Sequence, residues 1–219
     1  MRHDLPSLYE SKGLDYFEQS RPEVRKYVPK AARRVLDVGC GAGTFGAAIA
    51  REQQAEVWGI EPNERASLRA AGRLYRVLNA PFGAGLGLPA GYFDAICFLD
   101  VLEHLPTPTE QLEYAKTLLA PGGRIVASIQ NFRYFNNMWE LLVRRSARYE
   151  TQGIMDQTHL RIFTQSSIRL LFEEAGLIVE QLDGINPDRG GRKFALMNVL
   201  TLGWIADMRY LQFAVVARV

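Results

Sequence analysis

The chain has 219 residues, of which 47% are apolar and 23% charged, and its formal net charge is +2. This length suits one sizeable domain, and the composition is that of an ordinary globular protein. So small a net charge does not indicate a nucleic-acid-binding surface, and no apolar run is long enough to span a bilayer. The N-terminus lacks an apolar signal core, so we expect a cytoplasmic protein with Cys40 and Cys97 as free thiols.

The first thirty residues precede the first predicted strand. Apolar residues of 14–28, among them Tyr16 and Phe17, alternate with charges, and Pro22 marks a kink or a restart. We therefore expect an N-terminal helical segment within residues 1–30, which packs on the sheet or covers a ligand at its edge.

The most informative stretch is RVLDVGCGAGTFG, from Arg34 to Gly46. Its apolar start predicts a buried strand, its glycines a tight turn, and the alanine-rich residues 44–51 a helix. Glycines 39, 41 and 43 allow backbone angles that side chains forbid, and they expose main chain to a ligand. The helix that follows directs its free N–H groups at that ligand.

Further elements follow in regular alternation. We predict strands at 56–60, 74–78, 93–99, 124–129, 177–182 and 211–219. We predict helices at 63–71, 109–119 and 166–175, of which the first two begin at the caps Asn63 and Thr109 and the third ends before Gly176. Residues 121–123 are predicted to form a turn. This alternation predicts an α/β, doubly wound and mainly parallel sheet with right-handed crossovers. Two insertions interrupt it, one at 131–164 and one at 184–209, whose residues 194–208 form an apolar, helix-like run.

Two nucleotide-type ligands fit the glycine turn. Gly41, Gly43 and Gly46 satisfy the dinucleotide pattern GxGxxG, and Glu61 lies about twenty residues further on, where an acid holds a ribose. Asp37 argues against a dinucleotide, because a carboxylate there repels a pyrophosphate. It suits a ligand that carries an ammonium and a sulfonium and no phosphate, which is S-adenosylmethionine.

Four motifs in this order resemble those of class I S-adenosylmethionine-dependent methyltransferases: DVGCGAG, GIEPN, FDAICFLDVLEHL and LLAPGGRIVASIQN. The later segment MDQTHLRIFTQSSIRLLFEEAGLIVE resembles small-molecule and glycan-type members, and the whole is similar to quinone-biosynthesis O-methyltransferases. The resemblance implies a Rossmann-like, seven-stranded sheet with an antiparallel C-terminal strand and helical lid insertions. It makes residues 1–219 a single methyltransferase domain, in which residues 1–30 form an N-terminal helix that covers the cofactor.

The resemblance also implies the cofactor, S-adenosylmethionine, and its product S-adenosylhomocysteine. The residues expected to bind it are Asp37, Gly39, Cys40, Gly41, Gly43, Glu61, Pro62, Asn79, Ala80, Asp100, Val101 and Tyr16. A carboxylate at 61 can accept hydrogen bonds from both ribose hydroxyls. Asn79 stands where the family usually has an acid that meets the adenine amino group. Tyr16 either closes over the cofactor or packs its helix on the sheet.

Methyl transfer from a sulfonium is an in-line displacement, so positioning supplies most of the catalysis, and a base helps where the acceptor is a hydroxyl. His104 and His159 are the candidate bases, and we prefer His104; both can instead serve structural hydrogen bonds. Asp100, Glu103 and the two histidines also resemble a metal-ligand set, but we expect no metal, since such clusters are common without one.

The insertions are expected to shape the acceptor site. We interpret 131–164 as a lid that forms most of the acceptor pocket, with Arg148, Arg161 and Tyr134 as candidate contacts to an anionic acceptor; its arginines can equally form a solvated helix face. For 184–209 we favour packing against 131–164, and a dimer face, a flap over a lipid-like acceptor and a membrane-surface helix stay open.

The predicted function is methyl transfer, most simply to an oxygen of a small molecule or of a glycan or lipid precursor, and not to nucleic acid. Two other functions remain: a degenerate S-adenosylmethionine-binding interaction domain and an NAD-dependent oxidoreductase.

Overall fold

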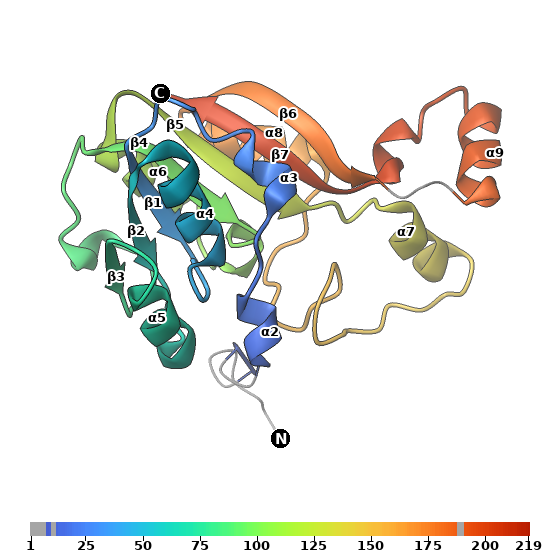
Figure 1. Cartoon of the computed structure of the whole chain (residues 1–219). Helices are drawn as coiled ribbons and strands as arrows, with labels where there is room; N and C mark the ends of the chain where they lie inside the picture. Colours follow the sequence, from blue (N-terminus) through green and yellow to red (C-terminus); the bar gives the residue numbers. More distant parts are fainter. Residues whose placement is uncertain (1–7, 10–11, 188–190) are drawn as a thin grey trace.

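A computed structural model of the protein describes residues 8–9, 12–187 and 191–219. The remaining parts of the expected N-terminal segment and of the 184–209 insertion lie outside the described residues. In the described part, seven strands form one sheet in the order β3-β2-β1-β4-β5-β7-β6 (Figure 1). The strands are β1 (Arg34–Val38), β2 (Glu56–Ile60), β3 (Arg76–Leu78), β4 (Phe93–Leu99), β5 (Leu119–Gln130), β6 (Ile178–Pro187) and β7 (Tyr210–Arg218).

The sheet has the predicted direction of its strands. Strands β1 to β5 pair in parallel, and β7 runs antiparallel to both of its neighbours, β5 and β6. The last strand of the chain is thus an interior strand, and β6 forms the edge. The α/β, mainly parallel, Rossmann-like prediction with an antiparallel C-terminal strand is confirmed.

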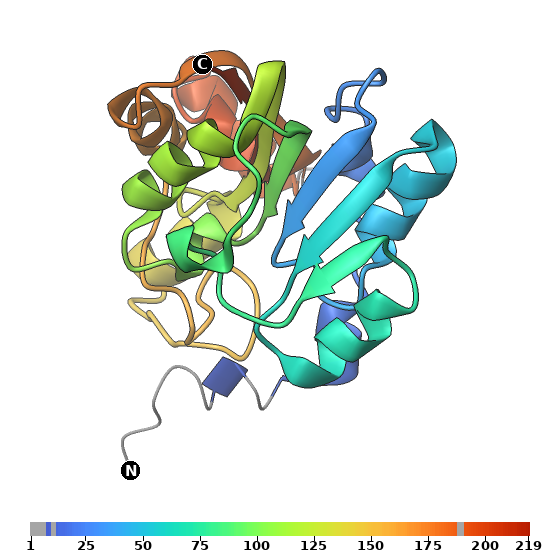
Figure 2. The same cartoon turned by 90° about the vertical axis from the view of Figure 1, so that its left-hand side faces the viewer.

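Helices cover both faces of the sheet, as Figure 2 shows. The short helix α3 (Pro22–Arg25), together with α4 (Thr44–Gln53) and α5 (Glu64–Ala71), covers one face, and α6 (Pro108–Leu118) and α8 (Gln165–Glu174) cover the other. The short helix α2 (Leu14–Phe17) lies at the carboxyl edge of the sheet, where Phe17 packs with Ala42 and Ala66. Pro22 begins α3, where its missing N–H costs nothing. The Asn63 side chain accepts from Ala66 N at 3.0 Å and caps α5, as predicted.

Two apolar cores lie on the two faces, because successive side chains of a strand alternate. In β1, Leu36 and Val38 pack with the α6–α8 core, whereas Val35 packs with Phe45 and Ile49 of α4. By the same alternation Asp37 faces the α4 side, with only 2% of its surface exposed. Cys40 and Cys97 are buried and free, as expected.

Several predicted boundaries are wrong for local reasons. Helix α6 starts at Pro108 after Thr107 instead of at a Thr109 cap, since proline suits the first helical position. Helix α8 starts at Gln165, where Thr164 and Ser167 form a capping box. Residues 121–123 lie within β5 but form a bulge there, because Phe93 of β4 pairs with Leu119 and Ala95 with Arg124. Strand β3 begins at Arg76 rather than at position 74, and β6 extends to Pro187.

The insertions form a helical extension, which we call the α7–α9 lobe and define as residues 131–150 and 191–209. It contains α7 (Phe135–Leu142), α9 (Arg192–Leu200) and the 3₁₀ helix η3 (Ala206–Arg209), and it projects from the β6–β7 end of the sheet (Figure 1). Its small core consists of Phe135, Phe194, Ile205 and Met208, so the favoured packing of the two insertions is confirmed for this face. The predicted helix of 194–208 ends at Leu200, because Leu202 and Gly203 have positive φ.

Candidate active site

The turn after β1 brings bare main chain to the carboxyl edge of the sheet. Gly39 and Gly41 have φ of 70° and 54°, which a residue with a side chain rarely adopts. A Cβ on Gly41 would lie 2.5 Å from the carbonyl oxygen of Phe17, which also accepts from Ala42 N at 2.9 Å. The glycine at 41 thus lets the N-terminal segment lie directly on the turn.

Gly43 has a different role from the one predicted. A Cβ there would lie 3.1 Å from both Cα and Cβ of Ala70, so Gly43 serves the close packing of α4 on α5. It is not among the residues that line the neighbouring cavity.

A cavity of about 1250 Å³ opens beside this turn, outside the carboxyl ends of β1, β2 and β4. Open parallel sheets bind their ligands at this edge. The predicted residues that line it are Tyr16, Asp37, Gly39, Cys40, Gly41, Glu61, Pro62, Asp100, Val101 and His104. The predicted residues that do not line it are Gly43, Asn79, Ala80, Tyr134, Arg148, His159 and Arg161.

Asp37 is the least satisfied acid on this cavity. Its side chain is buried, and its Oδ2 atom has no hydrogen-bond partner within the described residues. Burial raises the pKa of Asp37 to about 8, and the nearby Glu61 adds to this, while Arg21 opposes it. A carboxylate that lacks partners in a buried position is suited to a cationic ligand group.

Glu61 is held rigidly at the end of β2. Its Oε2 accepts from Gly41 N at 2.9 Å, and its Oε1 accepts from Asn63 N at 2.8 Å and from the Tyr9 hydroxyl at 3.1 Å. Burial raises the pKa of Glu61, and the two backbone N–H groups partly offset this. The carboxylate therefore joins the glycine turn to the N-terminal segment. Sequence reasoning missed Tyr9, which no motif marks.

Asn79 supports the same corner from outside. Its Nδ2 donates to the carbonyl oxygens of Glu61 at 2.9 Å and of Pro62 at 3.0 Å. The amide thus fixes the backbone that carries Glu61, while Pro81 and Phe82 line the cavity at this end.

Asp100 is the centre of a polar network that sequence reasoning did not find. Arg21 lies 2.6 Å from Asp100 Oδ2, Gln212 Nε2 donates to both carboxylate oxygens at 2.8 and 2.6 Å, and Ser128 Oγ donates at 2.9 Å. Arg21 and Asp100 both have positive φ. This network connects the N-terminal segment to β4, β5 and β7, and Arg21, Asp100 and Gln212 all line the cavity. Arg21 follows no sequence periodicity, so only the fold identifies it.

The two predicted histidines lie side by side, but of the two only His104 lines the cavity. His104 belongs to the 3₁₀ helix η2 (Leu102–His104), and its ring centroid is 4.6 Å from that of His159. His104 Nδ1 lies 3.1 Å from the carbonyl oxygen of Thr158, which only accepts, so Nδ1 carries the proton and Nε2 is free to accept one. Burial lowers the pKa of His104 to about 4, and His159 adds to this.

His159 is directed elsewhere. Its Nδ1 lies 3.0 Å from the carbonyl oxygen of Ile154, and burial lowers its pKa. It therefore braces the lid and the His104 ring, rather than lining the cavity as a second base.

Only the later part of the expected lid of 131–164 borders the cavity, where Glu150, Gln152, Asp156 and Leu160 line it. We call residues 150–164 the lid. Leu160 N and Arg161 N donate to the Glu103 carbonyl oxygen at 2.9 and 3.1 Å. The Arg161 guanidinium donates to the Pro106 carbonyl oxygen at 2.7 Å, so this side chain holds the lid to η2 instead of reaching an acceptor. Arg148 is exposed on the lobe, and Tyr134 is the N-cap residue of α7.

A salt bridge closes the lid onto the N-terminal segment. Lys12 Nζ lies 2.5 Å from Asp156 Oδ2, with 9% and 2% of the two side chains exposed. Burial raises the pKa of Asp156, but the hydrogen bonds from Lys12 and Thr158 outweigh it, so the pKa lies below its ordinary value.

The acids and histidines do not converge as a metal site. Across the described ranges, no group of three or more His, Cys, Asp or Glu side chains is placed to hold a metal ion. The oxygens of Asp100 instead receive Arg21, Gln212 and Ser128.

A parallel sheet with an antiparallel strand inserted next to its edge, a glycine turn after β1 and an acid after β2 define the class I methyltransferase fold. The model of the "Methyltransferase domain" family matches residues 1–182, and the chain belongs to this family. Its cofactor is S-adenosylmethionine, so the protein is an S-adenosylmethionine-dependent methyltransferase.

Relatives and solved structures agree with this assignment. The chain is 38% identical over 166 residues to a ubiquinone biosynthesis O-methyltransferase of Psychrobacter arcticus. This alignment covers 71% of the chain and 63% of that protein. It is 28% identical over 190 residues to the protein of the same name from Alkalilimnicola ehrlichii, covering 81% and 74%. The fold is similar to that of an S-adenosylmethionine-dependent methyltransferase from Mesorhizobium loti, with a TM-score of 0.64, 19% identity, and 94% and 100% of the two chains covered.

Proposed function

We propose that this protein transfers the methyl group of S-adenosylmethionine to an oxygen of a small, largely apolar acceptor, and that the cavity beside the glycine turn is its active site. The observation that carries the proposal is the buried Oδ2 of Asp37, which has no hydrogen-bond partner among the residues described. The relatives named as O-methyltransferases support transfer to oxygen.

The residues of the cavity suit the parts of the cofactor. Asp37 is the partner for its ammonium group and Arg21 for its carboxylate, because both side chains line the cavity and opposite charges attract most strongly where water is excluded. Glu61 is the acceptor for the ribose hydroxyls. Gly39 and Gly41 leave room for the ligand, and Pro62 and Phe82 flank the expected adenine position.

The bound cofactor supplies an electrophilic methyl group on a sulfonium and leaves as S-adenosylhomocysteine. His104 Nε2 takes the proton of the acceptor hydroxyl, because Thr158 holds Nδ1–H and fixes the tautomer. The depressed pKa keeps the ring neutral at pH 7, and the nearby Asp156 and Asp100 stabilise the imidazolium that forms. The lid and the N-terminal segment exclude water and hold the acceptor in line.

The part of the cavity around His104 indicates the kind of acceptor. Leu105, Pro106, Leu160 and Leu211 contribute apolar surface, and Gln130 and Asn186 contribute amide groups. Such a mixture suits a ring or chain with a few hydroxyls better than a highly charged nucleotide. We propose a phenolic or lipid-linked acceptor, with a glycan precursor second, in the cytoplasm.

Calorimetry and a methylation panel test the proposal. We expect S-adenosylhomocysteine to bind and NAD not to bind. In assays with radiolabelled S-adenosylmethionine, we expect label to enter catechol or a prenylated hydroquinone rather than a sugar nucleotide. Binding of S-adenosylhomocysteine without turnover on any acceptor would favour the degenerate interaction domain, and binding of NAD alone would favour the oxidoreductase.

A further inference from the structure

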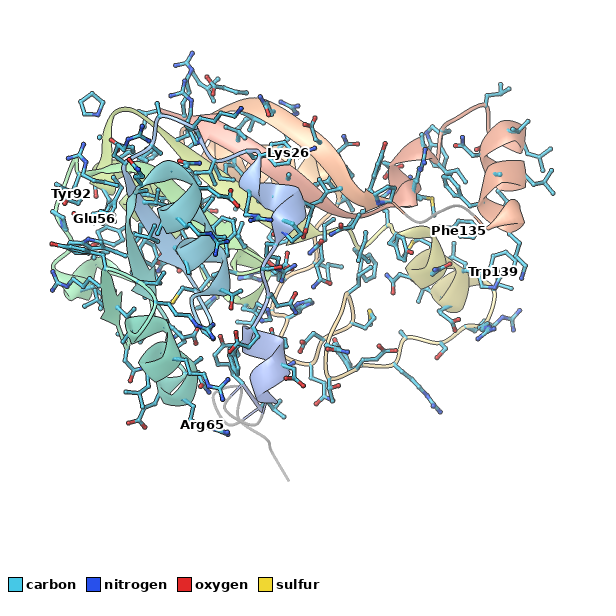
Figure 3. The ribbon with its side chains drawn as sticks, viewed as in Figure 1. Lys26, Glu56, Arg65, Tyr92, Phe135 and Trp139 are labelled. Carbon is cyan, nitrogen blue, oxygen red and sulfur yellow. The ribbon has the colours of Figure 1, made fainter. Side chains whose placement is uncertain are left out.

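The outer face of α9 and the turn after it leave large apolar side chains in solvent. Exposed fractions are 71% for Val199, 72% for Leu200, 96% for Leu202 and 76% for Trp204. Only the inner face of α9 is covered, where the Phe194 ring packs 5.4 Å from that of Phe135 on α7. Figure 3 shows Phe135 and Trp139 on the α7 side of this lobe.

The end of α7 carries further exposed apolar side chains. Leu142 and Val143 are 72% and 55% exposed, and the start of α9 lies against α7, since Lys193 Nζ is 4.8 Å from the centre of the Trp139 ring. Large apolar side chains that gather in solvent on one lobe indicate an interaction surface.

Positive charge accompanies this apolar surface. Residues 131–150 and 191–209 contain seven Lys or Arg and three Asp or Glu, a net charge of +4, whereas the whole chain has +2, so the remainder carries −2. Two of the three acids are paired within the lobe, Glu140 with Arg144 at 3.0 Å and Asp207 with Arg133 at 2.7 Å.

We propose that the α7–α9 lobe binds the surface of a bilayer that contains anionic lipid. Exposed Trp and Leu side chains on a lobe that also carries Lys and Arg suit a membrane interface, because the apolar groups can enter the headgroup region while the cations meet anionic lipid. A second copy of the chain is the less suitable partner, because an isologous contact would bring two positively charged lobes together. In the described part of the chain, no helix is long and apolar enough to cross the membrane, so the contact is with its surface.

The position of the lobe connects this surface with the active site. It leaves the sheet at the carboxyl ends of β5 and β6, where Gln130 and Asn186 line the cavity. Binding of the lobe would therefore bring the cavity near the bilayer and its lipid-soluble molecules. This consequence rests on the proposed function, whereas the membrane contact itself does not.

Vesicle co-sedimentation tests the proposal. We expect the protein to bind phosphatidylcholine vesicles with 30% phosphatidylglycerol at least tenfold more tightly than pure phosphatidylcholine, and 0.5 M NaCl to weaken this binding. The double variant Leu200→Ser/Leu202→Ser should weaken it at least tenfold. Lys193→Glu should weaken binding to the anionic vesicles by about fivefold or more and should leave binding to pure phosphatidylcholine vesicles unchanged.

The matched control is Leu68→Ser/Tyr75→Ser, since these side chains are 68% and 72% exposed near α5, away from the lobe. It should bind vesicles as the wild type does, and every variant should bind S-adenosylhomocysteine as the wild type does, which shows an intact fold. Anionic vesicles that fail to bind folded protein, or equal binding by the Leu200/Leu202 variant, would overturn the proposal. A dimer that this variant abolishes, without vesicle binding, would assign the surface to a second copy instead.

Discussion

The region around the glycine turn and the α7–α9 lobe are built in opposite ways. At the turn, backbone N–H groups donate hydrogen bonds to the Glu61 carboxylate from different segments. Asp37 differs, because its buried Oδ2 has no hydrogen-bond partner among the described residues. In the lobe, a small core of four buried side chains holds two helices whose outer faces remain apolar and exposed. The first region thus offers a buried carboxylate with an unpartnered oxygen, while the second offers exposed apolar side chains. We therefore expect the first to serve the cofactor and the two insertions to serve the acceptor.

Removal of the proposed base should have the largest effect. We expect His104→Ala to lower kcat by about 10²–10⁴-fold, because the variant lacks the Nε2 atom that is proposed to take the proton of the acceptor hydroxyl. Affinity for S-adenosylhomocysteine should stay within about twofold of the wild-type value. His159→Ala should lower kcat less, since its ring only braces His104. Equal kcat values for His104→Ala and wild type would contradict the assignment.

The pH profile of the same reaction gives an independent check. Because the pKa of His104 is lowered to about 4, its neutral form prevails above pH 5. We expect kcat to fall only as the pH approaches 4. A fall centred on pH 6.5 would show a histidine that titrates normally.

A methyl group on the glycine turn should weaken cofactor binding. Gly41→Ala forces a Cβ to within 2.5 Å of the Phe17 carbonyl oxygen at a positive φ. The free protein relieves this clash by moving the turn or the N-terminal segment, so binding must restore the strained arrangement. A cost of about 1–3 kcal/mol corresponds to a loss in affinity of about 5–150-fold. The control is Gly85→Ala, where nothing lies within 4 Å and φ is not positive; it should bind S-adenosylhomocysteine normally in calorimetry.

Loss of the lid salt bridge should loosen the lid without unfolding the sheet. Lys12→Met leaves the buried Asp156 without its cation, which costs about 1–3 kcal/mol locally. Amide hydrogen exchange at residues 150–159 should become about 5–150-fold faster, while β1 and β4 keep their protection. Lys12→Arg should restore most of the protection, and unchanged exchange in Lys12→Met would show that the bridge does not hold the lid.

The effect per pH unit on stability is the smallest single change, although it accumulates over several units. The folded pKa of Asp37 lies near 8, above its ordinary value of 3.8, so its contribution to stability is complete below pH 4 and is lost as the pH rises to 8. Relative to Asp37→Asn, the ligand-free wild type should lose about 1 kcal/mol of unfolding free energy per pH unit from 5 to 8. Urea titrations of both proteins measure this difference, and a constant difference would show that Asp37 is ionised throughout.

The sequence predicted the local structure around the glycine turn well because its signals are local. Strand β1, the glycine turn, Glu61 and the Asn63 cap each follow from neighbouring residues. Tyr9 and Arg21 escaped notice, because their roles arise from contacts with strand ends far along the chain. The same holds for Gln212, which meets Asp100 across the sheet.

Long-range contacts also explain the errors. Arg161 has the charge of an acceptor clamp, but the lid's course places it on the Pro106 carbonyl. Residues 121–123 have turn chemistry, yet they form a bulge inside β5, since Phe93 pairs with Leu119 and Ala95 with Arg124. The apolar run of 194–208 predicted burial, but the small lobe covers only one face of α9.

Calorimetric binding at pH 7 in buffers of different ionisation enthalpy tests the central claim about Asp37 most directly. S-adenosylmethionine should bind with the release of up to one proton, because its ammonium ionises the carboxyl group whose pKa lies near 8. Asp37→Asn should bind it at least tenfold more weakly, with that proton release absent. Equal affinity and equal proton release in both proteins, or a preference of the wild type for NAD, would contradict the account.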